Sequence, residues 1–248
     1  MIDVAGNIAR VRESMAAACE RAGRAQSEVQ LVLAAKYQPV ELMLAALDAG
    51  EQRFGHNMVQ QLVAAEEGLR VAGRGARTHA TSMIGHVQSN KLSAAMRYAQ
   101  RIDTVDSLKM AQQIARRQAA RIAAGEAAAG EAYPILLQVN SSGASTQFGC
   151  EPITVLDIAH QVASELPLVE IRGLMTIGAN EPDDPAAVIR SFEITRQLSE
   201  QLREIPGLAA AGTLSMGMTH DMELAIENGS TEIRIGTAIF GPRPNSSQ

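Results

Sequence analysis

The chain has 248 residues, a formal net charge of -5 and an apolar content of 46%. This length suits one barrel-sized domain over residues 1–248 better than two small domains. The acidic balance gives no reason to expect nucleic acid or an anionic membrane as a partner. No apolar run approaches the roughly 20 residues that cross a bilayer, so we expect no membrane span.

The N-terminus, the cysteines and the histidines indicate a compartment and exclude one kind of site. Residues 1–6 lack the basic and then apolar pattern of an export signal. Cys19 and Cys150 stand alone, without a C-x-x-C pair. The five histidines show no ligand spacing such as H-x-x-x-H. We therefore expect a cytoplasmic chain with reduced thiols and no metal site.

The first elements follow a helix–strand–helix order. Apolar residues recur at helical spacing between Ile8 and Ala22, which predicts an amphipathic helix ahead of the first strand. The apolar run over residues 29–35 then predicts a buried parallel strand. Pro39 suits the first turn of the helix that follows.

The same order of short strand, polar turn and amphipathic helix repeats to the end of the chain. Expected strands begin near Val29, Glu51, His79, Arg101, Pro134, Glu170, Ala211 and Thr231. Eight such units in about 250 residues are typical of a (β/α)8 barrel, here with an extra N-terminal helix. An open doubly wound sheet is the alternative, but it usually carries a G-x-G-x-x-G turn, and this sequence has none.

Lys36 stands out because the chain uses lysine so rarely. Of its 22 basic side chains, only Lys36, Lys91 and Lys109 are lysines. Lys36 follows the first predicted strand, where a buried ammonium must find an anion or lose its proton. A lysine that loses its proton becomes a nucleophilic amine that can form a Schiff base, which arginine cannot do. The alternative is a strand-end lysine that reaches out to solvent.

The last two strands carry small and polar residues where a barrel of this kind often binds phosphate. Residues 213–218 read Thr-Leu-Ser-Met-Gly-Met, and residues 232–237 read Glu-Ile-Arg-Ile-Gly-Thr. Small residues before helix starts offer backbone N–H groups and hydroxyls to an anion, although they also form ordinary turns. Arg234 alternates with isoleucines, so it points into the barrel and there contacts an anion, an aromatic nitrogen or a core carboxylate.

A Schiff-base lysine after the first strand and a phosphate cradle after the last two fit pyridoxal 5'-phosphate (PLP), whose aldehyde and phosphate lie on opposite sides of one ring. The sequence also resembles the YggS/PROSC family of pyridoxal phosphate homeostasis proteins. The matching segments are Leu33–Lys36, Phe54–Asn57, Ile84–Lys91, Val105–Ser107, Gln138–Asn140, Gly173–Ile177, Leu214–Met218 and Arg234–Gly241. They span nearly the whole chain in order.

This resemblance implies an alanine-racemase-like barrel, with PLP held as a Schiff base on Lys36. It implies that the phosphate is held by Ser215, Gly236 and Thr237, with Met216 counted among the cofactor-binding residues. Arg234 then faces the pyridine nitrogen. Asn57 is expected to line the ring.

The chain departs from the family pattern at three places, one of which is Ser82-Met83 where the family usually has His-Phe before I-G-H. The usual F-G-E-N-Y reads Phe-Gly-His-Asn-Met here, with His56 for the glutamate and Met58 for the tyrosine. The usual K-x-G after the fifth strand is Gln147-Phe148-Gly149. These changes bear on partner contacts and on the polarity of the pocket.

Three functions fit a reactive lysine, and we favour a carrier that holds PLP without substantial turnover and either passes it on, with apo PLP-dependent enzymes as candidate partners, or keeps it harmless. The first alternative is an amino-acid racemase, which needs a base on each face of the carbanion, whereas only Lys36 is well placed. An arginine at the pyridine nitrogen also weakens the ring as an electron sink. The second alternative is a Schiff-base aldolase without cofactor. We expect a monomer, because the second domain through which related racemases pair is absent.

Overall fold

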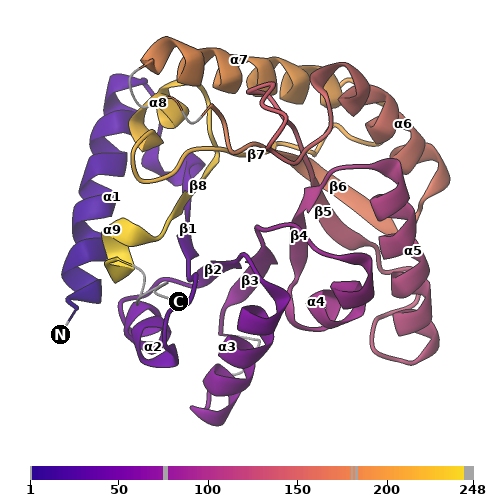
Figure 1. Cartoon of the computed structure of the whole chain (residues 1–248), viewed down its shortest axis with the longest axis horizontal. Coiled ribbons are helices and arrows are strands. Elements are labelled where there is room, and N and C mark those ends of the chain that lie inside the picture. Colours follow the sequence, from indigo (N-terminus) through magenta and orange to yellow (C-terminus); the bar gives the residue numbers. More distant parts are fainter. Residues whose placement is uncertain (1, 75–77, 180, 182–183, 243–248) are drawn as a thin grey trace.

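The computed structural model describes residues 2–74, 78–179, 181 and 184–242. Its eight parallel strands close into a barrel in chain order, with β8 beside β1 (Figure 1). The strands are β1 Gln30–Ala34, β2 Arg53–His56, β3 Ala80–Met83, β4 Arg101–Val105, β5 Tyr133–Gln138, β6 Val169–Met175, β7 Thr213–Ser215 and β8 Glu232–Ile235. Each begins within two residues of the predicted start, so the (β/α)8 prediction is confirmed.

Helices surround the barrel on the outside (Figure 1). They are α1 Val4–Arg21, α2 Val40–Asp48, α3 Val59–Val71, α4 Leu92–Tyr98, α5 Leu108–Ala123, α6 Val155–Glu165, α7 Pro185–Leu202, α8 Met222–Glu227 and α9 Thr237–Phe240, with short 3-10 turns η1 Gln26–Glu28, η2 Ser89–Lys91 and η3 Pro152–Thr154. The extra N-terminal helix is confirmed: α1 packs against α8, α9 and α2, where the last and first strands meet. None of the described helices has the length and apolarity of a membrane span.

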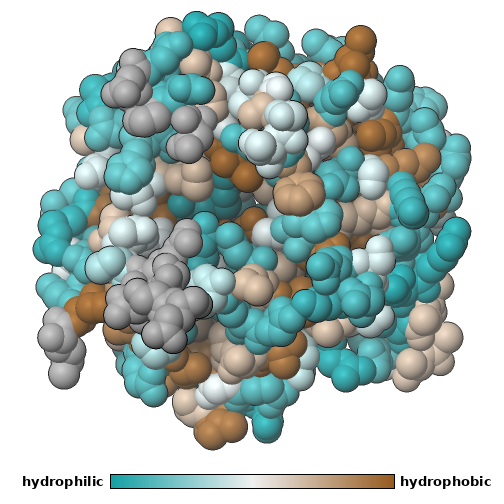
Figure 2. All heavy atoms as spheres, in the orientation of Figure 1, coloured by the Kyte–Doolittle hydropathy of each residue, from teal (hydrophilic) through white to brown (hydrophobic). Residues whose placement is uncertain are grey.

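The alternation of side chains along a strand separates an apolar outward face from a polar face inside the barrel. On β8, Ile233 and Ile235 point outward into the apolar cluster that holds Met15 of α1. Glu232 and Arg234 take the opposite face and lie buried inside the barrel. The space-filling view shows a hollow near the middle of the face that is turned toward the reader (Figure 2). The barrel interior is therefore charged where the surrounding shell is apolar.

Gly173 allows β6 to approach β7 closely. The pairing of β5 with β6 shifts register between Ile135 and Leu136, and Gly173 lies at that shift. Its φ of +148° lies in a region that L side chains rarely adopt, and a Cβ added there would lie 1.9 Å from the Thr213 carbonyl oxygen. No side-chain movement relieves a clash with backbone, so this position requires glycine.

We expect Gly173→Ala to lower the free energy of unfolding by about 2 kcal/mol or more, through backbone strain and the clash with Thr213. Chemical denaturation of the parent and the variant measures the difference. Gly212→Ala is the matched control, because a Cβ there meets no atom within 4 Å, and it should stay within about 0.5 kcal/mol of the parent. Equal stability of the two variants would contradict this account.

Candidate functional site

A pocket of about 200 Å³ lies where β1 and β8 end. Its lining residues are Ala34, Lys36, Gln38, Met218, Thr219, His220, Arg234, Gly236, Thr237 and Gly241. Four of the seven residues predicted to bind cofactor share this one pocket, although they come from opposite ends of the chain. The carboxyl ends of barrel strands are where sites of this fold gather.

Lys36 lies in the turn directly after β1 and is half-buried. The next residue, Tyr37, has a φ of +58°, so the chain turns sharply as soon as it has presented Lys36. The Tyr37 hydroxyl donates to the Met58 sulfur at 3.1 Å, and its side chain is 52% exposed. Tyr37 is therefore held at the rim while Lys36 lines the pocket.

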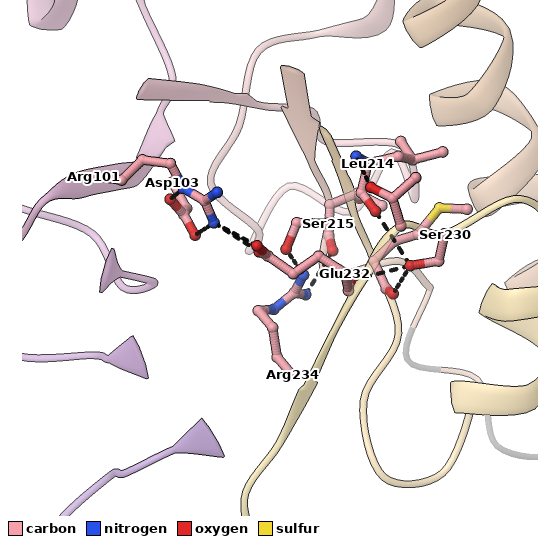
Figure 3. Close-up of polar contacts among 10 residues, drawn as sticks. Arg101, Asp103, Leu214, Ser215, Ser230, Glu232 and Arg234 are labelled. Atoms are coloured by element: carbon pink, nitrogen blue, oxygen red, sulfur yellow. Dashed lines mark hydrogen bonds and ion pairs between the residues drawn. The ribbon is translucent and has the colours of Figure 1, made fainter. Parts of the chain in front are cut away.

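Arg234 reaches the pocket from inside the barrel. Its guanidinium donates to the Ser215 hydroxyl at 2.9 Å and to the Thr176 carbonyl at 2.8 Å (Figure 3). Burial removes water from this cation and lowers the pKa of Arg234 from its usual value. Both partners are neutral. These two contacts are therefore not the direct ion pair with a core carboxylate that the sequence left open.

The carboxylates of the interior are held by a second arginine. Arg101 donates to Asp103 through Nε at 2.5 Å and to both Glu232 oxygens at 2.7 and 2.8 Å. Burial raises the pKa of Asp103 above its ordinary value. Burial acts the same way on Glu232, but the Arg101 charge and the Ser215 hydroxyl outweigh it and lower its pKa.

Gly236 and Thr237 form the wall of the pocket at the start of α9. A Cβ on Gly236 would lie 2.9 Å from the Ala34 carbonyl oxygen, so glycine lets β8 end close against β1. The Gly236 carbonyl accepts from the N–H groups of Ile239 and Phe240. N–H groups of a first helical turn have no acceptor within the helix, and with the exposed Thr237 hydroxyl they suit an anion.

The other predicted residues lie outside the pocket lining. Asn57 follows β2, is half-buried, and has a buried Oδ1 with no hydrogen-bond partner among the described residues. Ser215 is fully buried against Arg234 and Glu232. Met216 is fully buried in the core; its N–H donates to the Glu232 backbone carbonyl and its own carbonyl accepts from the Ser230 hydroxyl. Cofactor contacts of these three residues stay predictions, and for Met216 the structure offers no evident group.

Sequence reasoning missed three polar residues of the lining, Gln38, Thr219 and His220, whereas Met218 ends the segment predicted to bind phosphate. Thr219 and His220 follow directly after the Leu-Ser-Met-Gly-Met segment. Their place in the loop directly after β7 is therefore the feature that could have predicted them, since they belong to no motif of their own.

The departures from the family pattern near His56 and near Gln147 lie in different parts of the structure. His56 is 1% exposed beneath α3, and neither ring nitrogen has a hydrogen-bond partner among the described residues. Phe148 is 56% exposed and stacks on His86, with ring centroids 4.3 Å apart. Gln147 donates to the Gly178 carbonyl at 3.0 Å. None of these side chains lines the pocket, so the departures change residues around it and not its wall.

Comparison with known proteins places the chain. The model of the alanine racemase N-terminal domain matches residues 7–244. Pyridoxal phosphate homeostasis proteins from Vibrio cholerae and Escherichia coli K12 are 35% and 34% identical, over 99% and 100% of both chains. The chain belongs to the family of pyridoxal phosphate homeostasis proteins.

Solved structures agree with this family. An unknown protein from Bifidobacterium adolescentis is 38% identical, with a TM-score of 0.86 over 96% of this chain and 94% of its own. PipY of Synechococcus elongatus, solved with PLP bound, is 27% identical, with a TM-score of 0.77 over 96% and 100%. Alanine racemase from Corynebacterium glutamicum is 14% identical with a TM-score of 0.66, which shows the shared fold; 62% of its chain is covered.

The buried His56 gives this homeostasis-family barrel a pH dependence. Burial lowers the pKa of His56 from 6.5 to about 4, so the unfolded chain binds a proton that the folded chain excludes. This contribution to stability is present above pH 6.5 and is lost as the pH falls toward 4, by up to roughly 3 kcal/mol. Urea denaturation across this range should show a steeper loss for the parent than for His56→Gln. Parallel pH profiles would contradict the assignment.

Proposed function

We propose that this protein binds PLP through a Schiff base on Lys36 and acts as a carrier in PLP homeostasis, without substantial turnover. The pocket is the observation that carries the proposal, because it places a lysine, a buried arginine and a glycine-threonine helix start together. Membership of the homeostasis family and the PLP-bound structure of PipY support it.

The residues of the site fit this cofactor. PLP brings an aldehyde that reacts with an amine, a phosphate and a ring nitrogen. Lys36 supplies the amine. Gly236 and Thr237 supply N–H groups and a hydroxyl to the phosphate. Asn57, whose buried Oδ1 has no partner among the described residues, supplies a polar atom toward the ring.

Arg234 faces the ring nitrogen in this proposal. A guanidinium has five N–H donors and does not release a proton in a protein, so it donates a hydrogen bond and leaves the ring nitrogen unprotonated. Two of its donors are used by Ser215 and Thr176. An unprotonated ring nitrogen is a weak electron sink, which favours holding the cofactor over racemisation.

The tyrosines give no second base for racemase chemistry. Tyr37 is turned toward Met58, Tyr98 donates to Glu67 on α3, and Tyr133 is buried with its hydroxyl on the Ala99 carbonyl. His220 is the observation that favours the racemase alternative, because its exposed imidazole lines the pocket with Lys36. Exchange of the alanine α-proton, measured with and without the His220 imidazole, tests whether this histidine moves a proton.

The proposal extends to a monomer in the cytoplasm that passes PLP to apo-enzymes. Cys19 and Cys150 are both free and buried, which is compatible with a reducing compartment. Burial raises the pKa of Cys150 to about 12, so this thiol is packed and unreactive.

Borohydride reduction of the PLP-loaded protein, followed by peptide mapping, should locate the pyridoxyl group on Lys36. Lys36 lines the pocket, whereas the pocket lining contains neither Lys91 nor Lys109. Lys36→Arg keeps a cation but cannot form the Schiff base, and it should lose the absorbance of the bound cofactor. Lys109→Arg is the control and should label like the parent. Label on Lys91 or Lys109, or no Schiff-base absorbance at all, would refute the assignment.

Incubation of the PLP-loaded protein with L-alanine in deuterated water should show little exchange of the α-proton and no inversion. The reason is that Lys36 serves one face of the ring and Arg234 weakens carbanion stabilisation. Exchange with inversion near the ~10 s⁻¹ typical of enzymes would establish a racemase instead. His220→Ala is the matched variant: if it abolishes such exchange, His220 is the second base.

A further inference from the structure

Four charged side chains share the barrel interior below the pocket. Arg101 and Asp103 come from β4, and Glu232 and Arg234 come from β8 (Figure 3). In a closed ring of eight strands in chain order, β4 and β8 lie on opposite sides. The ion pair between Arg101 and Glu232 therefore crosses the barrel.

Ser215 lies between this ion pair and the pocket. It is on β7, pairs in register with Glu232 on β8, and accepts from the Arg234 guanidinium at 2.9 Å. Arg101 fixes both Glu232 oxygens from the far side, at 2.7 and 2.8 Å. Glu232, Ser215 and Arg234 are all buried, with exposures of 2%, 0% and 5%.

We infer that Glu232 and Ser215 are positioning residues for Arg234: they hold its guanidinium in the orientation that faces the PLP ring. Arginine has a long side chain with high rotamer entropy, so one fixed orientation in a pocket wall needs partners on the protein side. Ser215 supplies one and the Thr176 carbonyl the other. Glu232, the register partner of Ser215, places a negative charge that Arg101 holds in position beside this hydroxyl, and that charge favours the Arg234 cation in this orientation.

This inference rests on the proposed binding of PLP, and it assigns Ser215 a role different from the phosphate contact that the resemblance implied. The two roles make different predictions. A hydroxyl that contacts phosphate acts independently of Arg234. A hydroxyl that acts through Arg234 has no effect once the guanidinium is gone.

A double-mutant cycle separates the two roles. Apo-protein is titrated with PLP for the parent, Ser215→Ala, Arg234→Gln and the double variant, with absorbance as the readout. We expect Ser215→Ala to weaken PLP binding roughly two- to thirtyfold in the parent. In the Arg234→Gln background the same change should alter affinity by less than about twofold. Ser215→Ala should also shift the cofactor absorbance in the same direction as Arg234→Gln.

Glu232→Gln extends the cycle by one residue and should behave like Ser215→Ala. Glu51→Gln is the control, because Glu51 is equally buried (4% exposed) and paired with Arg12, but lies before β2, away from the pocket. It should reduce stability and leave the cofactor spectrum unchanged. Thermal melting of each apo-variant verifies folding, and Ser215→Ala alone carries the test if Glu232→Gln does not fold.

The outcomes are distinct. A Ser215→Ala effect that persists undiminished without Arg234, or no effect in the parent, overturns the inference. Failure of the parent itself to bind PLP refutes the proposed function, which is a different result.

Discussion

The balance of charge inside the barrel is the constraint on which the site depends. Arg234, Asp103 and Glu232 are buried there and Arg101 is partly buried, and each lies where an opposite charge or a hydroxyl compensates the loss of water. Removing one member of such a set leaves an uncompensated charge in a place that water does not reach. A wholly apolar interior would pack as well but could not present a guanidinium at the pocket. Under the proposed function the charged interior presents Arg234 to the cofactor, whereas the apolar shell under the helices holds the fold together.

Close backbone approaches shape the barrel at two places. Gly236 lets β8 end against Ala34 of β1, and Gly173 lets β6 lie against β7. Both positions exclude a side chain because the atoms in the way are backbone atoms. The seam between the first and last strands is therefore tight enough to form one continuous pocket wall from two distant parts of the chain.

Much of the fold follows from sequence pattern. The repeated order of short strand, polar turn and amphipathic helix locates all eight strands, although only some of them, such as β1, are apolar nearly throughout. The direction of Arg234 also follows, since strand alternation places it opposite Ile233 and Ile235. Its partners do not follow: whether a buried guanidinium meets a carboxylate or a hydroxyl depends on the register of β7 against β8, which pairs Ser215 with Glu232.

The loop residues of the pocket could not be predicted either, because tertiary packing and not local sequence pattern sets their positions. His220 lines the pocket because of the path the chain takes after β7, and no periodicity records that path. His56 lies buried without a hydrogen-bond partner among the described residues, a state that no local pattern would predict. Resemblance to relatives locates the segments of the site, but the contacts within it are set by tertiary packing.

The pocket straddles the seam of the barrel, with Lys36 from the first unit and Arg234, Gly236 and Thr237 from the last. During synthesis, the lysine leaves the ribosome long before its counterparts exist. The complete pocket arises only when β8 closes the ring against β1, so under the proposed function cofactor capture follows translation of nearly the whole chain. A ligand that bridges the two ends binds the closed ring and not the open one, and by mass action it stabilises closure. PLP bound as proposed would therefore stabilise the finished barrel.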